Sequence, residues 1–169
     1  MKAQQLESKK LLLYPVPIYE QIDDFINQWY TIVNKEYRTV IGSIGMVHAH
    51  PKWNNTRVQV IITEENRRLG YGLEALELLE HDIFSRMSYQ RIAVKVANFN
   101  KPAIGLFKKA GYKLEGIQEQ GYQYNDQYYD LILLRLLRHE YFQRLQKRAN
   151  GNKSEISECF PDLIDSNKK

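Results

Sequence analysis

The sequence has a single cysteine and no long apolar segment. Cys159 is the only thiol in 169 residues, so no disulfide can form within the chain, and this favours a reducing compartment. The apolar runs at 11–13 and 131–137 are far shorter than the roughly 20 residues that a membrane-spanning helix needs. Pro15 and Pro17 follow the first run closely, so we expect no signal-peptide core there. These absences predict a soluble, cytoplasmic protein with no membrane partner.

Motifs for binding metals and nucleic acids are also missing. No cysteines or histidines occur at zinc spacing, and we expect no metal site. The sequence contains no aromatic-and-glycine RNA motif and no basic-zipper heptads. The net charge is +4 and the pI is about 9.0, with basic residues concentrated over 135–148. Nucleic-acid binding therefore stays a minor alternative, supported only by this basic segment.

The composition is that of one folded domain. Hydrophobic residues make up 43% of the chain, which is enough for one core and too little for two domains of ordinary size. We expect the domain to span 1–148. The remaining residues, 149–169, are rich in Asn, Ser, Lys and acids, and we expect a flexible tail there.

A glycine-rich turn between a strand and a helix is the most informative segment. Residues 61–75 read IITEENRRLGYGLEA, a β-branched strand followed by two arginines, Gly70, Gly72 and a helix start. Glycines allow a tight turn with the amides pointing outward, and the first amides of a helix attract anions. This pattern predicts a diphosphate-binding turn.

Two common nucleotide motifs do not fit this turn. A Walker loop ends in Gly-Lys-Ser/Thr, whereas Leu73 and Glu74 follow Gly72 here. Gly70, Gly72 and Ala75 match the dinucleotide pattern G-x-G-x-x-A. However, the next strand, 91–97, leads into Asn-Phe-Asn at 98–100 and so lacks the acidic residue that would bind a ribose.

The turn and two later segments resemble the GNAT acetyltransferases. Residues 67–72 match R-x-x-G-x-G, the pyrophosphate loop of that family. Residues 98–116, NFNKPAIGLFKKAGYKLEG, are similar to its N-x-x-A segment and closing Gly-aromatic pair. Tyr129-Asp130 and the apolar run after it resemble the last long strand of the branch that acetylates ribosomal-protein N-termini and polyamines. The resemblance covers about 28–138.

The resemblance and the residue patterns together predict an α/β (α+β) fold with a single domain. We expect a mixed, mostly antiparallel sheet, a splayed parallel pair at 56–62 and 91–97, and helices on both faces. Leu73, Leu76, Leu79, Ile83 and Met87 would form the apolar face of a helix, with Glu74, Glu77, Glu80 and Asp82 lying largely elsewhere. The other expected elements are a strand at 9–18, helices at 19–27, 100–110 and 139–148, and hairpins at 28–33/38–48 and 112–124/127–137.

The resemblance implies an acetyl-CoA-dependent N-acetyltransferase. Acetyl-CoA would be the co-substrate, and a peptide or protein N-terminus, or a small amine such as a polyamine, would accept the acetyl group. Backbone groups of Ile62 and Glu64 would bind the pantetheine arm, and the Ile62 amide would polarise the thioester. The implied cofactor-binding residues are Ile62, Glu64, Arg67, Arg68, Leu69, Gly70, Tyr71, Gly72, Leu73, Asn100, Ala103 and Phe107.

The sequence does not assign the acid and base of the reaction. Many GNAT enzymes have a proton-donating tyrosine at the position of Phe107, which cannot donate a proton. The alternative acids are Tyr112, Tyr122, Tyr124 or a water molecule, or the reaction uses no acid at all. Tyr112 matches a core aromatic of the family. Candidate bases are Glu64, Glu65, Glu119 and His48.

Phe107 also favours a second hypothesis, a catalytically silent CoA-binding sensor or scaffold. The sequence leaves open whether residues 135–145 form a homodimer interface.

Overall fold

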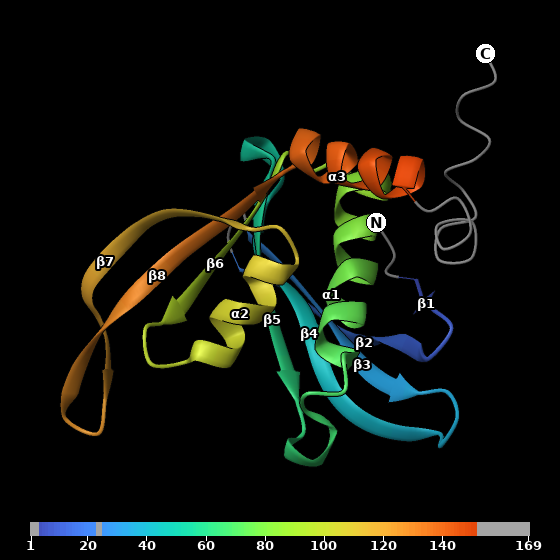
Figure 1. Ribbon diagram of the computed structural model, residues 1–169, viewed down its shortest axis with the longest axis horizontal. Helices are drawn as coiled ribbons and strands as arrows, with labels where there is room; N and C mark the ends of the chain where they lie inside the picture. Colours follow the sequence, from blue (N-terminus) through green and yellow to red (C-terminus); the bar gives the residue numbers. More distant parts are fainter. Residues whose placement is uncertain (1–3, 23–24, 152–169) are drawn as a thin grey trace.

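One sheet of eight strands runs through the part of the chain that the computed structural model describes, residues 4–22 and 25–151 (Figure 1). The strand order is β1-β2-β3-β4-β5-β6-β8-β7, and only β5 and β6 are parallel neighbours. This confirms the predicted mixed, mostly antiparallel sheet. The strands are β1 (Leu6–Glu7), β2 (Leu11–Ile22), β3 (Phe25–Asn34), β4 (Thr39–His50), β5 (Asn55–Ile62), β6 (Arg91–Ala97), β7 (Lys113–Tyr124) and β8 (Gln127–Leu137).

The described helices all lie on one face of the sheet (Figure 1). They are α1 (Tyr71–His81), which continues as a π-helical turn over Asp82–Arg86, α2 (Lys101–Lys109) and α3 (Arg138–Gly151), with short 3-10 turns at Pro51–Trp53 and Glu64–Asn66. Helix α1 contacts α2, and ion pairs join its Glu77 and Glu80 to α3. The expectation of helices on both faces is therefore wrong for the described residues. We call the other face of the sheet the open face.

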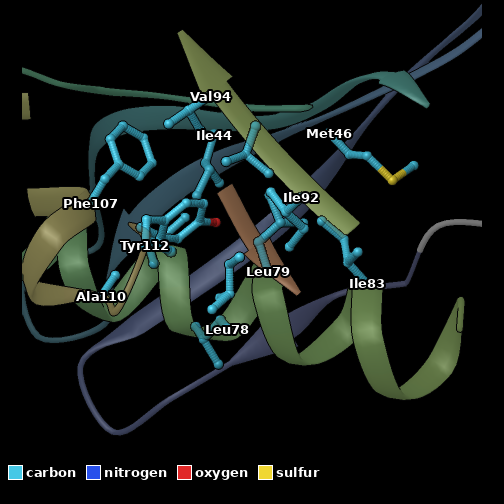
Figure 2. Close-up of a cluster of buried hydrophobic side chains, with 14 of the residues drawn as sticks. Ile44, Met46, Leu78, Leu79, Ile83, Ile92, Val94, Phe107, Ala110 and Tyr112 are labelled. Atoms are coloured by element: carbon cyan, nitrogen blue, oxygen red, sulfur yellow. The ribbon is translucent and has the colours of Figure 1, made fainter. Parts of the chain in front are cut away.

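Packing of α1 on the sheet forms the centre of the core (Figure 2). Leu76, Leu79 and Ile83 are fully buried, and Leu73 and Met87 pack against the core, as the predicted apolar face requires. Ile44 of β4 and Ile92 of β6 face these side chains. Each fully buried side chain of this size contributes about 1.5–3 kcal/mol, so this contact holds α1 firmly against the strands.

Two acidic residues of the same helix are buried, contrary to the prediction. Glu80 is completely buried and pairs with Arg144 of α3, with 2.7 Å between Oε2 and Nη2. Asp82 is 3% exposed, and its Oδ2 accepts from Arg86 Nη2 at 2.6 Å. Helical periodicity did not show this burial, because it depends on how α1 packs and on an arginine partner for each acid.

The helix expected at 19–27 is absent. Residues up to Ile22 belong to β2, and β3 begins at Phe25, so the segment forms a hairpin with Ile22 opposite Phe25. The acidic residues suggested a helix, but the aromatic and β-branched residues around them favour strands. The other elements occur as predicted, including β6 at 91–97, both other hairpins and the helix after 138.

The C-terminal prediction lies outside the described residues. Residues beyond 151, which include Cys159, carry no structural description, so the expected tail is not tested. Among residues 4–22 and 25–151, the helices are too short or too polar to span a bilayer.

Candidate active site

The parallel strands β5 and β6 separate soon after they meet. They pair only from Asn55–Arg91 to Arg57–Ala93, and the second half of β5 has no partner strand on that side. Thr63 donates its amide to Ile41 at 3.0 Å, so by the alternation of an antiparallel ladder the backbone groups of Val60 and Ile62 point away from β4. They point into the gap, where they can bind an extended chain. The predicted splayed pair is confirmed.

The glycine turn leads from β5 into α1. A 3-10 turn over Glu64–Asn66 is followed by Arg68 with φ +63° and Gly70 with φ +90°, and α1 begins at Tyr71. The amides of Leu73 and Glu74 both donate to the Gly70 carbonyl, at 3.1 and 3.2 Å. Within the described chain, no turn or loop hydrogen bond uses the amides of 68–72. These amides and the positive end of the α1 dipole make the turn suitable for an anion.

A cavity of about 690 Å³ lies between this turn, the edge of β5 and one face of α2. Eight of the twelve residues implied as cofactor-binding line it: Ile62, Arg67, Arg68, Gly70, Gly72, Leu73, Asn100 and Ala103. The structure therefore brings together the glycine turn and the asparagine segment, which are about 30 residues apart in the sequence. Their role in binding a cofactor remains a prediction.

Four implied residues do not line the cavity. Glu64 and Leu69 are exposed on the turn, and the Tyr71 hydroxyl accepts a hydrogen bond from Asn34 Nδ2 at 3.0 Å. Phe107 is 4% exposed and belongs to the core (Figure 2). For Leu69 and Tyr71, a role in binding rests on their backbone amides alone.

The sequence reasoning missed seven residues of the cavity wall. They are Val60, Ile61, Asn66, Pro102, Gly105, Leu106 and Lys109. Those on α2 could have been found from their spacing, because residues three to four apart lie on the same face of a helix. Lys109 places a cation in this wall.

Arg67 occupies one of the backbone acceptors of the gap. Its Nε donates to the Ile62 carbonyl at 3.0 Å. With Arg68 and Lys109, it places three cationic side chains around the cavity. An amide of a bound pantetheine arm would compete with Arg67 for the carbonyl, and the guanidinium would then be available for a phosphate.

Asn100 closes the cavity at the start of α2. Its Oδ1 accepts from the Ala103 amide at 3.2 Å, which makes it the N-cap of α2, and Pro102 in the first turn needs no amide partner. Gly111 ends the helix with φ +88°. Capping and lining the cavity are thus both properties of Asn100.

A comparison with protein families decides what this architecture is. The model of the Acetyltransferase (GNAT) domain matches residues 20–133, which is more than half of the chain. The chain belongs to the GNAT acetyltransferase family. The predicted resemblance and the fold class are confirmed.

Solved structures of a spermidine/spermine N-acetyltransferase, SpeG from Vibrio cholerae, share the GNAT fold of this chain. A complex of SpeG with CoA and spermine has a TM-score of 0.65 and 19% sequence identity, covering 69% of this chain and 68% of SpeG. A complex of SpeG with manganese ions has a TM-score of 0.66 and 19% sequence identity, and the match covers 70% of this chain and 69% of SpeG. At this identity the likeness concerns the fold alone.

No tyrosine is among the described residues that line the cavity. Phe107 takes the place of the family tyrosine, and its ring packs edge-on against Tyr112 with centroids 5.2 Å apart. Tyr112 is 4% exposed, and burial raises its pKa well above the ordinary value, with a further contribution from the neighbouring Glu80. Tyr112 is therefore a core residue, as its match to the family's core aromatic indicates.

The remaining acid and base candidates lie outside the cavity wall. Tyr122 and Tyr124 are on the β7–β8 hairpin, where their rings stack at 6.4 Å. Glu65 and Glu119 are exposed, and His48 is exposed on β4 with its ring 6.0 Å from Phe25. Hydrogen bonds with its own backbone and with Thr63 lower the pKa of Glu65. The structure assigns the catalytic base to none of these residues.

Proposed function

We propose that this GNAT protein transfers the acetyl group of acetyl-CoA directly to a primary amine. The observation that carries the proposal is the cavity that joins the glycine turn to the splayed β5–β6 pair. The amides of 68–72 would bind the diphosphate, and Arg67, Arg68 and Lys109 would balance its charge. The pantetheine arm would lie along the edge of β5, where Val60 and Ile62 present their backbone groups.

The transfer needs no covalent enzyme intermediate. The neutral amine attacks the thioester carbon, the carbon–sulfur bond breaks, and the amine proton leaves to the base or to water while the CoA thiolate takes up a proton. The Ile62 amide would donate to the carbonyl oxygen as negative charge develops. Holding the thioester and amine together supplies much of the rate enhancement, so the lack of a tyrosine at 107 does not prevent catalysis.

The acceptor is an amine that must lose its proton before attack. A lysine-type amine has an ordinary pKa near 10.4 and an α-amine one near 7.7 to 8. A peptide N-terminus therefore needs less help from a base, which supports a peptide or protein acceptor. The structural likeness to SpeG, which was solved with CoA and spermine, supports a small polyamine instead.

Calorimetry with acetyl-CoA tests the cofactor, and release of the CoA thiol with peptide and polyamine panels tests the reaction. We expect saturable binding and thiol release with at least one panel. Absence of binding heat and of a thermal shift at millimolar acetyl-CoA would refute the proposal. Acetylated products identified by mass spectrometry would separate the two acceptor classes.

A silent CoA-binding module is the second candidate. Phe107 favours it, because the buried ring offers no proton to the thiolate. This candidate predicts acetyl-CoA binding with no thiol release from any amine. The basic segment gives little support to nucleic-acid binding, because Arg135, Arg144 and Arg148 all pair with glutamates of the same chain.

A further inference from the structure

Four aromatic side chains cluster on the β7–β8 hairpin and the loop after β6. Phe99 is at the centre, with its ring 4.7 Å from Tyr129 and 6.2 Å from both Tyr122 and Tyr124. Tyr122 and Tyr124 stack with an interplanar angle of 13°. Phe99, Tyr122 and Tyr124 remain between 41% and 52% exposed. We call these four residues the aromatic platform.

The aromatic platform belongs to the open face of the sheet. Leu134 and Leu136 of β8 are buried on the helix face, so the odd-numbered residues, including Tyr129, point to the opposite side. Tyr122 lies directly opposite Tyr129 in the ladder, and Tyr124 follows on the same side. The rings therefore lie across the sheet from the helices that cover the cofactor cavity.

The aromatic platform also lies beside the gap between β5 and β6. β6 ends at Ala97, opposite Leu131, and Tyr129 is two residues further along β8, about 7 Å at the rise of a strand. The Asn98 amide donates to the Asp130 carbonyl at 2.9 Å, which ties the loop of Phe99 to the hairpin. Figure 1 shows the hairpin reaching past the end of β6. An acyl chain that passes through the gap from the helix face would emerge next to these rings.

The hairpin that carries three of the four rings has a negative formal charge in an otherwise basic protein. Residues 116–134 contain three acids, Glu119, Asp126 and Asp130, and no lysine, arginine or histidine, whereas the whole chain carries +4. In the described residues, the arginines that lie over rings are Arg138 and Arg144, both over rings of α3. Lys95, on the same face at the foot of the hairpin, is held by Gln118 at 3.0 Å. Exposed aromatic faces in a negative field favour an organic cation and disfavour nucleic-acid bases.

We propose that the aromatic platform binds a second cationic group of the acceptor, at a distance from the amine that is acetylated. This inference rests on the proposed function and specifies its acceptor: a molecule with one amine at the thioester and another cation over the rings. A small diamine and a peptide with a lysine near its N-terminus both have this chemistry.

Matched acceptors test the proposal. A diamine is compared with the monoamine of the same chain length, and a Gly-Lys peptide with its Gly-norleucine analogue, in the wild type and in the double variant Tyr122→Leu/Tyr124→Leu. We expect the double variant to raise KM for the dicationic acceptors by about 5- to 10-fold, the effect of two exposed cation–π contacts, and to leave KM for the neutral-tailed analogues unchanged. The dicationic acceptor whose KM rises more in the double variant, the diamine or the Gly-Lys peptide, identifies the class of acceptor that supplies the cation.

Two controls separate the rings from other effects. Tyr122→Phe/Tyr124→Phe keeps the rings and should keep the wild-type KM for the dicationic acceptors. Tyr128→Leu changes an exposed tyrosine that alternates to the other side of the same hairpin and should have no effect on KM. An equal rise in KM for monocationic and dicationic acceptors, or no rise for either, would overturn the proposal.

The experiment stays informative if no amine is acetylated. The same diamine and monoamine are then titrated calorimetrically into the CoA-saturated protein. Tighter binding of the diamine that is lost in the leucine variant would support the aromatic platform even though the proposed transfer had failed. Equal affinities for both amines, or for both proteins, would overturn it. Circular dichroism and thermal melting establish that the variants are folded.

Discussion

Gly72 shows how a single residue can keep the cofactor cavity open. A Cβ atom at this position would lie 3.5 Å from Ile62 Cγ1 and 3.6 Å from Leu106 Cδ2, which is ordinary contact. An alanine would thus fit the protein, but a larger side chain would extend into the cavity. The fold therefore tolerates a side chain here, and the proposed cofactor would not.

We therefore predict that Gly72→Leu weakens acetyl-CoA binding at least tenfold, about 1.4 kcal/mol, with little change in the melting temperature. Calorimetry and thermal melting measure the two effects. Gly116→Leu, at a glycine of β7 that does not line the cavity, is the control and should bind normally. Unchanged affinity in Gly72→Leu would contradict the proposed position of the cofactor.

Glu80 is a second residue whose environment leads to a measurable prediction. Burial raises its pKa to about 7, even though Arg144 lowers it. The fold favours the protonated acid, so the contribution of this group to stability is complete below its ordinary value of 4.5 and is lost as pH rises through about 7. Between pH 5 and pH 8 the loss should be on the order of 2 to 3 kcal/mol.

Glu80→Gln should remove this pH dependence, because glutamine does not titrate. Urea unfolding of wild type and variant at pH 5 and pH 8 measures it. Glu77→Gln, which removes a partly exposed partner of Arg148 from the same helix, is the control for loss of an ion pair with α3. If the free energies of unfolding of wild type and Glu80→Gln differ by the same amount at both pH values, Glu80 stays ionised and the prediction is wrong.

At the scale of elements, one carboxylate of α3 bridges the helix to both strands of the last hairpin. Glu140 accepts from Lys113 Nζ of β7 at 2.7 Å, from Arg135 of β8, and from the Leu137 amide at 3.2 Å. Burial alone would raise its pKa, but the hydrogen bonds from Lys113 and Arg135 lower it to about 2. The helix start is therefore stabilised by an ionised acid over the whole neutral range.

We predict that Glu140→Gln destabilises the protein by about 1 to 2 kcal/mol at pH 7, after allowance for solvent screening. A lowered pKa gives stability that is present above about 4.5 and lost as pH falls through about 2, so the difference should shrink in acid. Urea unfolding at pH 7 and pH 3 measures the effect. Glu115→Gln, which removes the more exposed partner of Arg91, should cost less than about 1 kcal/mol.

Most elements were predictable from local patterns, and the failures have a common cause. β6 was predicted at 91–97 and occurs there, because alternating apolar residues report a half-buried strand directly. The segment 19–27 was misassigned because its acids resemble a polar helix surface, whereas pairing with β3 makes it a strand. Pairing with a distant segment outweighs local preference, and no local window contains that information.

At the scale of the whole molecule, the cavity proposed to bind the cofactor is built from a short part of the chain. All of its lining residues lie between Val60 and Lys109. The N-terminal strands and α3 support this part through the core, but they contribute no residue to the wall. Deleting the residues beyond 151 therefore tests whether they contribute to the site.

We predict that a chain ending at residue 151 binds acetyl-CoA with unchanged affinity and transfers acetyl groups with unchanged kcat. Calorimetry and thiol release measure both. A chain ending at 137, which lacks α3 and its ion pairs with Glu77 and Glu80, is the comparison and should unfold more easily. A loss of affinity in the 151-residue chain would mean that the C-terminal residues take part in the site.

The sequence alone determined the family, the glycine turn, and the strand and helix that flank it, because each depends on residues close together in the chain. It also showed that the usual tyrosine is replaced by Phe107. Only the tertiary structure decided that the helices share one face, that Glu80 is buried with Arg144, that Lys109 reaches the cavity, and that four aromatic residues meet beside the gap. These properties arise from contacts between segments that lie far apart in sequence, and their energies depend on burial, which the order of residues does not specify.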